Sequence, residues 1–382
     1  MKKIAIIGGG ASGMACAVFL AREGRYHVSV YESGERLGKK LSATGNGQGN
    51  VTNINMNASY YFSDDGEKVG RALARFGAEE TVAFLQTMGG IFLPDARGRV
   101  YPAGRQASAV TDLFRTELAR LNVNVKTGAR IAKIEGFDNF RLSYAGGEEK
   151  VSAVVLCAGG MAAPEFGTDG NGYRLAAAFG HTVTECTPAL VKLKCDSSLV
   201  RGLKGIRVDA NLKLYRGKRE VAFARGDLLF AEGGLSGDAV FRISSYAKEG
   251  DVLKLDFLPD VSRERAAQAI GAKAGAECLL CVVNNGLGRA LFKRAQGNKT
   301  ELLTLLKEFP VPVTGTFGFR NAQVTKGGIP LSETDEFLQS VKRKGLYFAG
   351  EILNVDGACG GYNLQWAFTS AYTVAEGIKR CF

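Results

Sequence analysis

The sequence predicts an α/β protein: a Rossmann-like domain with a parallel sheet and a β-meander, interrupted by an inserted β-rich, barrel-like domain with a small helical part. Three observations predict this fold. A short apolar run at 4–7 ends in a glycine turn, and a helical pattern follows at once. Two further apolar runs, 151–157 and 345–350, read as buried strands that also end in glycine. Between them, residues 191–258 alternate polar and apolar side chains, as strands of a barrel or sandwich do.

The composition allows a large core and limits the chemistry. The chain has 382 residues, of which 46% are hydrophobic and 23% charged, so two or three folding units are expected. We place the Rossmann-like domain at 1–190 and 326–382 and the insert at 191–325. Two histidines exclude a His-rich metal site, and no metal ligand set is predicted. A bound cofactor is therefore a better source of chemistry than a side-chain triad.

Hydrophobic periodicity sets the order of the elements. The strand at 4–7 is followed by helical spacing of Met14, Val18 and Ala21 up to Gly24 and then by an alternating strand over 27–32, which is an opening βαβ unit. The next elements are a helical stripe, a hairpin, a second helix and a β-meander, at 66–88, 91–101, 106–121 and 123–156. The insert then carries short helices and a strand, and the chain ends with a buried strand and a helix, at 263–309, 317–324, 345–350 and 361–379.

The first turn carries a dinucleotide-binding pattern. Gly8, Gly10 and Gly13 form GxGxxG between a strand and a helix, and Glu32 follows Gly13 by 19 residues. The first glycine allows the tight turn, the second lets a pyrophosphate approach the backbone, and the third lets helix and strand pack closely. The helix N-terminus supplies N–H groups, and Glu32 is expected to accept ribose hydroxyls.

The choice of dinucleotide favours FAD. Glu32 disfavours a 2′-phosphate, although Arg36, Lys39 and Lys40 could accommodate NADP. A nicotinamide dehydrogenase would need an acid–base side chain in its second half, and His181 is better interpreted as a helix-end residue. A flavin brings its own electron chemistry and needs mainly positioning from the protein.

The C-terminal segment suits the same cofactor. The strand at 345–350 ends at Gly350 and Glu351, where ligands of parallel sheets collect. The helix that begins at Gly361 would direct the N–H groups of Tyr362, Asn363 and Leu364 at the flavin edge that becomes negative on reduction.

These motifs, taken together, resemble a known family. The segments are Gly38–Asn53, Gly98–Pro102, Cys157–Gly160, Gly170–Tyr173, Gly180–Thr182 and Gly345–Ala367, the last containing GEILNVDGACGGYNLQWA. The chain resembles the YhiN/BaiN family of FAD-dependent oxidoreductases, which implies a flavoprotein with a GR2-like FAD domain and an inserted β-rich domain. The fingerprint and the C-terminal segment together lead us to expect that FAD binds non-covalently. One branch of that family reduces conjugated double bonds of bile-acid intermediates. The chain departs from the family at 47–50, with GQGN in place of GRCN, and at 231–238, where Ala-Glu and Gly-Asp replace Thr-His and Gly-Pro.

The expected cofactor site draws on the whole Rossmann-like domain. Its residues are Gly8, Gly10, Ala11, Ser12, Gly13, Glu32, Arg36, Lys39, Lys40, Leu41, Gly45, Asn46, Gly47, Asn50, Ile131 (by its backbone), Ala158, Gly159, Gly160, Gly350, Glu351, Gly361, Tyr362, Asn363 and Leu364. No residue is assigned as catalytic. The sequence contains one GxGxxG, so NAD(P)H is expected as a transient co-substrate without a domain of its own.

The expected function is an FAD-dependent oxidoreductase that takes electrons from NAD(P)H and reduces an activated C=C of a small organic substrate, steroid- or bile-acid-like. Two alternatives stay open: a flavin-dependent RNA-modifying enzyme, and a non-enzymatic flavin-bound redox sensor. The net charge is +11, of which +8 falls within 191–325, but the basic residues there are scattered, so nucleic acid is the less favoured partner. The oligomeric state is left open.

The eight cysteines indicate a reducing compartment. They show no metal-binding spacing and lie among apolar neighbours, so free thiols and a cytoplasmic location without membrane association are expected. Cys278 and Cys281 form a CxxC that we interpret as two core thiols on one helix face, and Cys359 as a packed thiol of the flavin loop.

Overall fold

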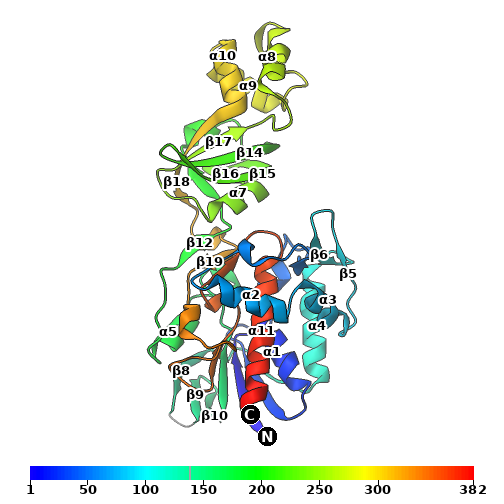
Figure 1. The fold of residues 1–382 in the computed structure, drawn as a ribbon, viewed down its shortest axis with the longest axis vertical. Helices are drawn as coiled ribbons and strands as arrows, with labels where there is room; N and C mark the ends of the chain where they lie inside the picture. The colour runs from blue at the N-terminus through cyan, green and yellow to red at the C-terminus, as the bar shows by residue number, and fades with distance from the viewer. Residues whose placement is uncertain (137–138) are drawn as a thin grey trace. The chain divides into compact units, whose positions relative to one another are not determined.

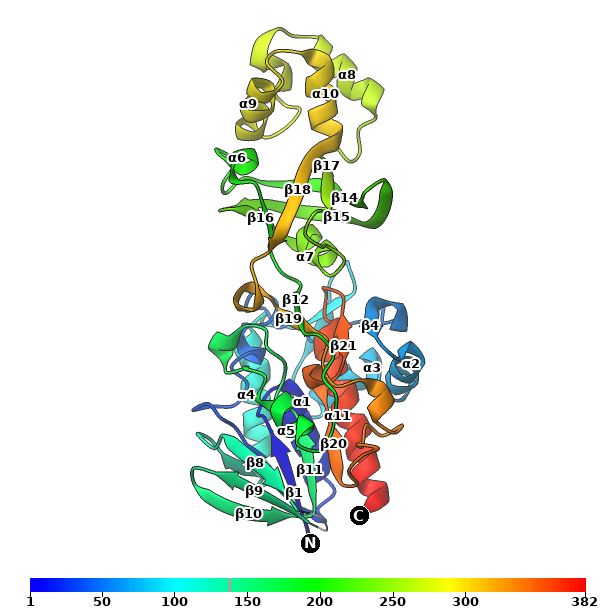
Figure 2. The ribbon, with the colours of Figure 1, turned by 90° about the vertical axis from the view of Figure 1, so that its left-hand side faces the viewer.

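The computed structural model describes residues 1–136 and 139–382, which divide into two compact units (Figures 1 and 2). The first unit comprises Met1–Thr187 and Val324–Phe382, and the second comprises Pro188–Gln323. No helix among the described residues combines the length and apolar character needed to cross a membrane.

The first unit is built on a five-stranded parallel sheet, as the sequence predicts. The strand order is β20-β11-β1-β2-β7, and the bounds are Leu346–Phe348, Ala153–Leu156, Lys2–Ile7, Tyr26–Tyr31 and Asn124–Lys126. In the register, Ile7 of β1 lies opposite both Tyr31 of β2 and Leu156 of β11. Three strands therefore end together at the edge where the glycine turn begins, the usual place for a ligand in such a sheet.

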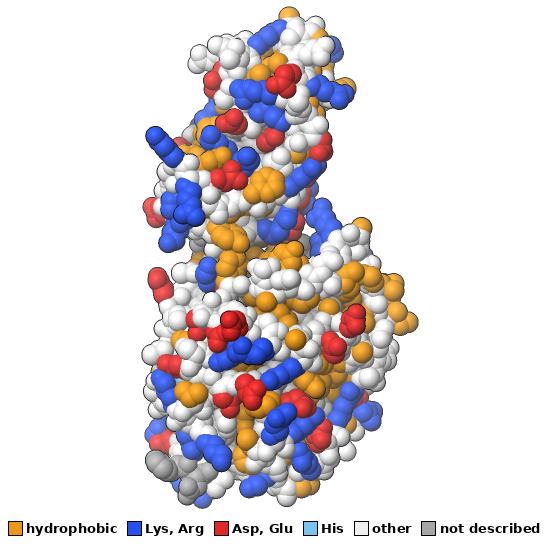
Figure 3. Space-filling model, in the orientation of Figure 1, with side chains coloured by type: hydrophobic (Ala, Val, Ile, Leu, Met, Phe, Trp, Pro, Cys, Tyr) orange, Lys and Arg blue, Asp and Glu red, His pale blue; other side chains and the backbone are white. Residues whose placement is uncertain are grey.

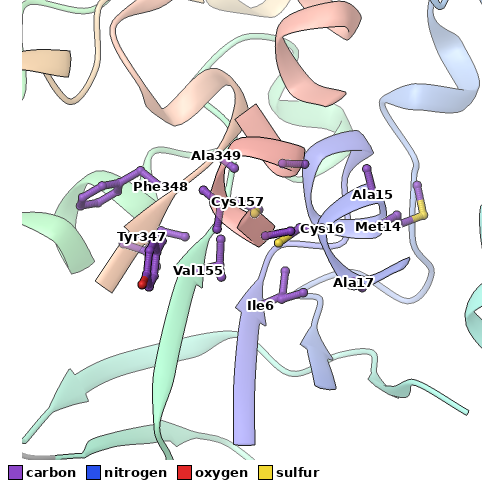
Figure 4. Close-up of a cluster of buried hydrophobic side chains, with 14 of the residues drawn as sticks. Ile6, Met14, Ala15, Cys16, Ala17, Val155, Cys157, Tyr347, Phe348 and Ala349 are labelled. Atoms are coloured by element: carbon purple, nitrogen blue, oxygen red, sulfur yellow. The ribbon is translucent and has the colours of Figure 1, made fainter. Parts of the chain in front are cut away.

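Helices α1 (Ala11–Ala21) and α11 (Tyr362–Cys381) lie side by side against this sheet (Figures 1 and 2). Figure 4 shows the packing: Ile6, Val155 and Phe348 come from three neighbouring strands, and Met14 and Cys16 come from α1. All five side chains are fully buried. Small residues along α1 allow the close approach of helix and sheet that positions the turn before it.

The remaining elements of this unit surround the sheet. They are β3 (Thr52–Asn53), β4 (Tyr61–Ser63), α2 (Gly66–Arg75), α3 (Ala78–Gln86), β5 (Phe92–Pro94), β6 (Arg99–Pro102), α4 (Ala107–Arg120), β8 (Ile131–Glu135), β9 (Phe140–Tyr144), β10 (Gly147–Val151), α5 (Asn171–Ala177), β19 (Val324–Lys326) and β21 (Val355–Gly357). The stripe predicted over 66–88 is two helices, because Gly77 starts a new helix whose Glu80 side chain accepts the Gly77 N–H at 2.8 Å.

The second unit is a closed barrel, which confirms the predicted barrel-like insert. Its strand order is β13-β16-β15-β14-β17-β18, with bounds Leu193–Cys195, Gly234–Ser236, Arg219–Ala231, Arg207–Arg216, Val252–Asp256 and Phe309–Thr316. Its helices are α6 (Ser197–Val200), α7 (Asp238–Ser244), α8 (Arg263–Gly271), α9 (Asn285–Arg294) and α10 (Lys299–Glu308).

Two details of the insert differ from expectation. The prediction of a strand at 317–324 is wrong, since the last barrel strand, β18, lies earlier in the chain. In β18 the side chains of Phe309, Val311 and Val313 are buried, and the two prolines between them are exposed, a position that a strand tolerates. The interpretation of the CxxC as two core thiols is wrong for Cys281, which is exposed on a residue with φ +63°, whereas Cys278 is buried.

Candidate cofactor site

The turn after β1 is tight at two glycines and open at the third. A Cβ at Gly8, where φ is +105°, would lie 2.3 Å from the Cys157 carbonyl oxygen. A Cβ at Gly13 would lie 1.9 Å from the Gly8 oxygen. At Gly10, by contrast, a Cβ would meet no atom within 4 Å. The turn therefore needs glycine for packing at two positions and leaves free space at the third.

Helix α1 presents an uncapped N-terminus to that space. No side chain caps it at Gly10, and its first backbone bond runs from the Met14 N–H to the Gly10 oxygen at 2.9 Å. The N–H groups of Ala11, Ser12 and Gly13 precede that bond and have no partner within the helix. Such a terminus attracts an anion, for which a pyrophosphate is well suited.

The end of β20 lies against the same helix start. A Cβ at Gly350 would lie 2.5 Å from the Ser12 hydroxyl oxygen, and that hydroxyl donates to the Ala349 carbonyl at 3.4 Å. Two parts of the predicted site, separated by more than 300 residues of chain, thus meet at one point.

Glu32 closes the other side of the turn. One carboxylate oxygen accepts the Gly9 N–H at 2.8 Å, and the other accepts the Gly34 N–H at 2.6 Å. The first oxygen keeps a further lone pair for a hydroxyl group, whereas the second also accepts the Ser33 hydroxyl at 3.2 Å. Lys39 extends toward this turn, because its ammonium would lie 3.4 Å from a Cβ at Gly34, whereas Arg36 is exposed.

Lys40 and Glu351 bind each other. The Lys40 ammonium lies 2.7 Å from one Glu351 oxygen, and the other oxygen accepts the Thr325 N–H at 2.9 Å. The Thr325 hydroxyl oxygen in turn accepts the Met161 N–H at 2.7 Å, and a Cβ at Gly160 would lie 2.4 Å from it. This bridge joins the loop after β2, the turn after β11 and the end of β20.

The N-terminus of α11 is also uncapped by a side chain. Gly361, with φ +102°, packs so closely that a Cβ there would lie 2.5 Å from the Thr52 oxygen and 3.0 Å from the Asn50 amide nitrogen. Asn363 holds the preceding loop, since its amide accepts the Gly357 N–H at 2.8 Å and donates to the Gly357 oxygen at 2.7 Å. The segment ending at Asn50 therefore meets the start of α11, as the pattern of predicted residues requires.

Several expected contacts are placed less directly. Leu41 is buried in the core, while Gly45, Asn46 and Gly47 form an exposed loop in which all three have positive φ. The Ile131 carbonyl already accepts a hydrogen bond from the Asn171 amide at 3.0 Å. Ala158 and Gly159 follow β11 and are half-buried, with Gly159 at φ +70°.

Sequence reasoning missed Asp356. This residue is 1% exposed, and neither carboxylate oxygen has a hydrogen-bond partner among the described residues. Burial raises its pKa to about 7, Lys326 opposes the shift and Glu351 reinforces it. Asp356 stands inside the C-terminal motif quoted above, but nothing in the sequence shows that its carboxyl group is buried in a strand that pairs with β4.

The residues present fit FAD. The open space at Gly10 lies at the uncapped N-terminus of α1, which is suited to a pyrophosphate. A second uncapped N-terminus, that of α11, follows β21 in the chain. Glu32 lies at the turn, and its oxygen that accepts the Gly9 N–H can accept one further hydrogen bond. FAD matches this arrangement, because its pyrophosphate is an anion and its flavin edge becomes negative on reduction, so each would suit one of the two helix N-termini.

Comparison with known proteins identifies the family. The model of the HI0933-like protein Rossmann domain matches residues 2–377. The chain is 34% identical to a 3-dehydro-bile acid delta(4,6)-reductase from Clostridium scindens, over 97% of this chain and 98% of the relative. It is 28% identical to a ribosomal RNA dihydrouridine synthase from Escherichia coli, over 98% of this chain and 97% of the relative.

Among solved structures, the chain is similar to a 3-ketosteroid-delta4-(5alpha)-dehydrogenase from Rhodococcus jostii RHA1. The TM-score is 0.54 at 17% identity, and the match covers 100% of this chain and 97% of that one. This likeness supports the fold, and the resemblance to FAD-dependent oxidoreductases found in the sequence is confirmed. The chain therefore belongs to the HI0933-like Rossmann family, a family of FAD-binding oxidoreductases, and FAD is its cofactor.

Proposed function

We propose that this protein is an FAD-dependent reductase that adds hydrogen across a C=C bond conjugated to a carbonyl group in a small apolar substrate, with NAD(P)H as the electron donor. One observation carries the proposal: two relatives with different substrates share this chemistry. A 3-dehydro bile acid with double bonds at positions 4 and 6 is a conjugated ketone, and the double bond that becomes saturated in dihydrouridine is conjugated to a ring carbonyl.

The cofactor residues follow from the geometry of the site. The N–H groups of Ala11, Ser12 and Gly13 would hold the pyrophosphate over Gly10, and Glu32 would accept ribose hydroxyls. At the other end, the N–H groups of Tyr362, Asn363 and Leu364 would favour negative charge on the flavin. The remaining contacts are proposed at Gly8, Gly13, Arg36, Lys39, Lys40, Leu41, Gly45, Asn46, Gly47, Asn50, Ile131, Ala158, Gly159, Gly160, Gly350, Glu351 and Gly361.

Bound FAD, once reduced, supplies a hydride to the substrate. The chain's own residues do the rest. The Lys40–Glu351 bridge fixes the end of β20 relative to the loop after β2, so the cofactor's surroundings are rigid before the substrate enters. Asn363, bound to both backbone groups of Gly357, keeps the loop before α11 in place and orients the helix N-terminus.

Ribosomal RNA is the second candidate substrate, because of the relative from Escherichia coli and the net charge of +8 in 191–325. Part of the basic charge of the barrel unit is paired: Arg216 binds Asp251 at 2.9 Å, Arg225 binds Asp260 at 2.6 Å, and Lys204 binds Glu232 at 2.7 Å, although the excess of basic residues in 191–325 cannot be matched by the acidic residues there. Figure 3 shows Lys and Arg side chains mixed with Asp and Glu on the visible face of this unit. Paired charges contribute little to phosphate binding, so these pairs reduce the basic charge available to ribosomal RNA, and the unpaired excess is what the RNA test below addresses.

Two anaerobic half-reactions test the proposal. The purified protein should carry an oxidised flavin spectrum that NADH or NADPH bleaches. A steroid 4-en-3-one or 4,6-dien-3-one should then restore it, with loss of the conjugated enone absorbance. Restoration by ribosomal RNA lacking dihydrouridine, but not by the steroid ketones, would favour the RNA enzyme. Failure of both acceptors would refute double-bond reduction.

A further inference from the structure

We propose that the substrate of this enzyme is an apolar carboxylic acid, whose carboxylate Arg105 binds at one face of the β3-β6-β5 sheet. This rests on the proposed function and deepens it, because it names a class of substrate and a residue that selects it.

One face of this sheet is partly open to solvent. Asn53 of β3 lies opposite Arg99 of β6, and Leu93 of β5 lies opposite Tyr101 of β6. Directly opposite residues share a face, as do residues two apart in a strand, so these four side chains lie on one side of the sheet, which we call the hairpin face. The side chains on the opposite side are buried: Thr52, Phe92 and Val100.

The hairpin face carries aliphatic side chains at its edge. Leu93 is 56% exposed, and Ile91, two residues earlier, is 67% exposed. The pairing with β6 continues to Ile91, whose carbonyl accepts the Ala103 N–H at 2.8 Å. Figure 3 shows hydrophobic side chains gathered on the right-hand side of the first unit, where Figure 1 labels β5 and β6. Such an edge suits the apolar body of a small ligand.

The hairpin face also meets the loop that leads into α11. The Asn53 amide donates to the Gly360 carbonyl at 3.1 Å, and a Cβ at Gly360 would lie 4.0 Å from the Arg99 Cδ atom. Burial raises the pKa of Tyr101, and the Cys359 thiol adds to the rise, so that thiol lies near the phenol. A ligand on this face therefore lies beside the loop before the helix N-terminus that the proposed site assigns to the flavin.

Arg105 adds a positive charge that no carboxylate neutralises among the described residues. Its guanidinium lies 4.2 Å from the centroid of the Tyr101 ring and donates to the Gln48 amide oxygen at 3.4 Å, and both of these groups are neutral. Arg99, by contrast, is bound to Asp95 at 2.6 Å. Because Arg105 is exposed, its charge is available to an anion.

The backbone at Arg105 is one that glycine adopts more easily than arginine. Its φ is +48°, in the left-handed region, and its N–H donates to the Pro102 carbonyl at 2.8 Å, which closes a turn. Other residues than glycine are disfavoured in that region, and those that adopt it cluster at ligand sites. The turn alone would be more stable with glycine, which favours a role for the arginine side chain.

The make-up of the hairpin face favours an apolar acid over a nucleic acid. One guanidinium group can bind one carboxylate through two parallel hydrogen bonds. Leu93 and Ile91, next to it on the sheet, offer no side-chain hydrogen bonds to the further phosphates and sugars of a nucleic acid. An apolar molecule that ends in a carboxylate matches both parts of the face.

The test compares Arg105→Gly with Arg25→Gln in the FAD-loaded protein. Arg25 is a matched control, because it is exposed, its guanidinium lies 5.0 Å from the Tyr26 ring centroid, and it donates to the Lys379 carbonyl at 2.9 Å. Tyr26 begins β2, at the other end of that strand from the glycine turn. Because glycine suits the φ of +48°, Arg105→Gly should unfold at or above the wild-type Tm.

The two substrates are a 4-en-3-one steroid with a side-chain carboxylate and the methyl ester of the same acid. The wild type should bind the acid more tightly, as followed by the change in the flavin spectrum on titration. In Arg105→Gly, Kd and KM for the acid should rise about 10- to 150-fold, the range for a lost charged hydrogen bond, while kcat for the acid and both constants for the ester stay unchanged. Arg25→Gln should match the wild type with both compounds. In Leu93→Ser, KM should rise for acid and ester alike, because they share the apolar body.

Equal losses for acid and ester in Arg105→Gly, or unchanged constants for the acid, would overturn the assignment. A loss confined to NAD(P)H or to ribosomal RNA would assign Arg105 to a phosphate group and overturn it as well. A wild type that reduces the ester without preferring the acid refutes this inference alone, whereas a wild type that reduces neither compound refutes the proposed function.

Discussion

Substitution of two glycines in one turn should separate cofactor binding from folding. Gly10 has φ −79° and ψ −168°, which any residue adopts, and a Cβ there meets no atom within 4 Å. Valine is a poorer N-cap than glycine, so Gly10→Val should cost at most about 1 kcal/mol, or about 2–4 °C in Tm. A Cβ at Gly13 would lie 1.9 Å from the Gly8 oxygen, so Gly13→Ala should cost about 1–3 kcal/mol.

The assay is thermal unfolding of the FAD-stripped proteins, followed by titration with FAD. Gly10→Val should unfold near the stripped wild type but fail to regain stoichiometric flavin, because its side chain fills the space where the pyrophosphate approaches. Gly13→Ala should unfold earlier even without cofactor. If Gly10→Val purifies with a full complement of FAD, the dinucleotide does not cross this turn and the site is wrongly placed.

Three further outcomes follow from the same contacts. Glu32→Ala should weaken FAD by about 10- to 150-fold for each charge-assisted bond lost, as measured by flavin fluorescence titration, and unchanged affinity would exclude a ribose contact. Lys40→Met and Glu351→Gln, which break one 2.7 Å ion pair, should lower FAD affinity by amounts that do not add in the double variant. Burial opposes ionisation of Glu333, but bonds from Lys342, Thr182 and His181 lower its pKa to about 2. The stabilisation by the Glu333 carboxylate is therefore present above pH 4.5 and is lost as the pH falls toward 2. In Glu333→Gln, the free energy of urea unfolding should fall less over that pH interval than in the wild type, by at most about 3 kcal/mol.

Much of the fold could be predicted from the sequence because its buried parallel strands have a distinct hydrophobic pattern. Buried parallel strands such as 4–7 and 153–156 are continuous apolar runs, and both end in glycines whose tight packing forbids other residues. The insert could be predicted as β-rich from a different signal, the alternation of polar and apolar side chains over 191–258. Strand β18 was misplaced because Pro310 and Pro312 read as breakers, yet both face outward from the barrel.

Residues of the candidate cofactor site could be predicted only where the backbone conformation or close packing requires glycine. Gly8 and Gly361 have positive φ and no room for a side chain, so the pattern and the geometry agree there. The pairing of Lys40 with Glu351 was not readable, since 311 residues separate them and either alone reads as a cofactor contact. Thr325, which binds the turn after β11, has no motif at all.

Asp356 shows why a buried carboxyl group is harder to predict from sequence than a glycine turn. Cofactor sites rest on backbone N–H groups, whose positions follow from turns that restrict sequence. The acidity of a carboxyl group depends instead on burial and on charges from other elements, here Lys326 of β19 and Glu351 after β20. Asp64 directly follows β4, and Asp356 lies within the partner strand β21. Asp64 is exposed and its carboxylate has three hydrogen-bond partners, whereas Asp356 is buried with none among the described residues. The pairing of β21 with β4, which places Asp356 opposite Phe62, joins segments almost 300 residues apart and leaves no local pattern in the sequence.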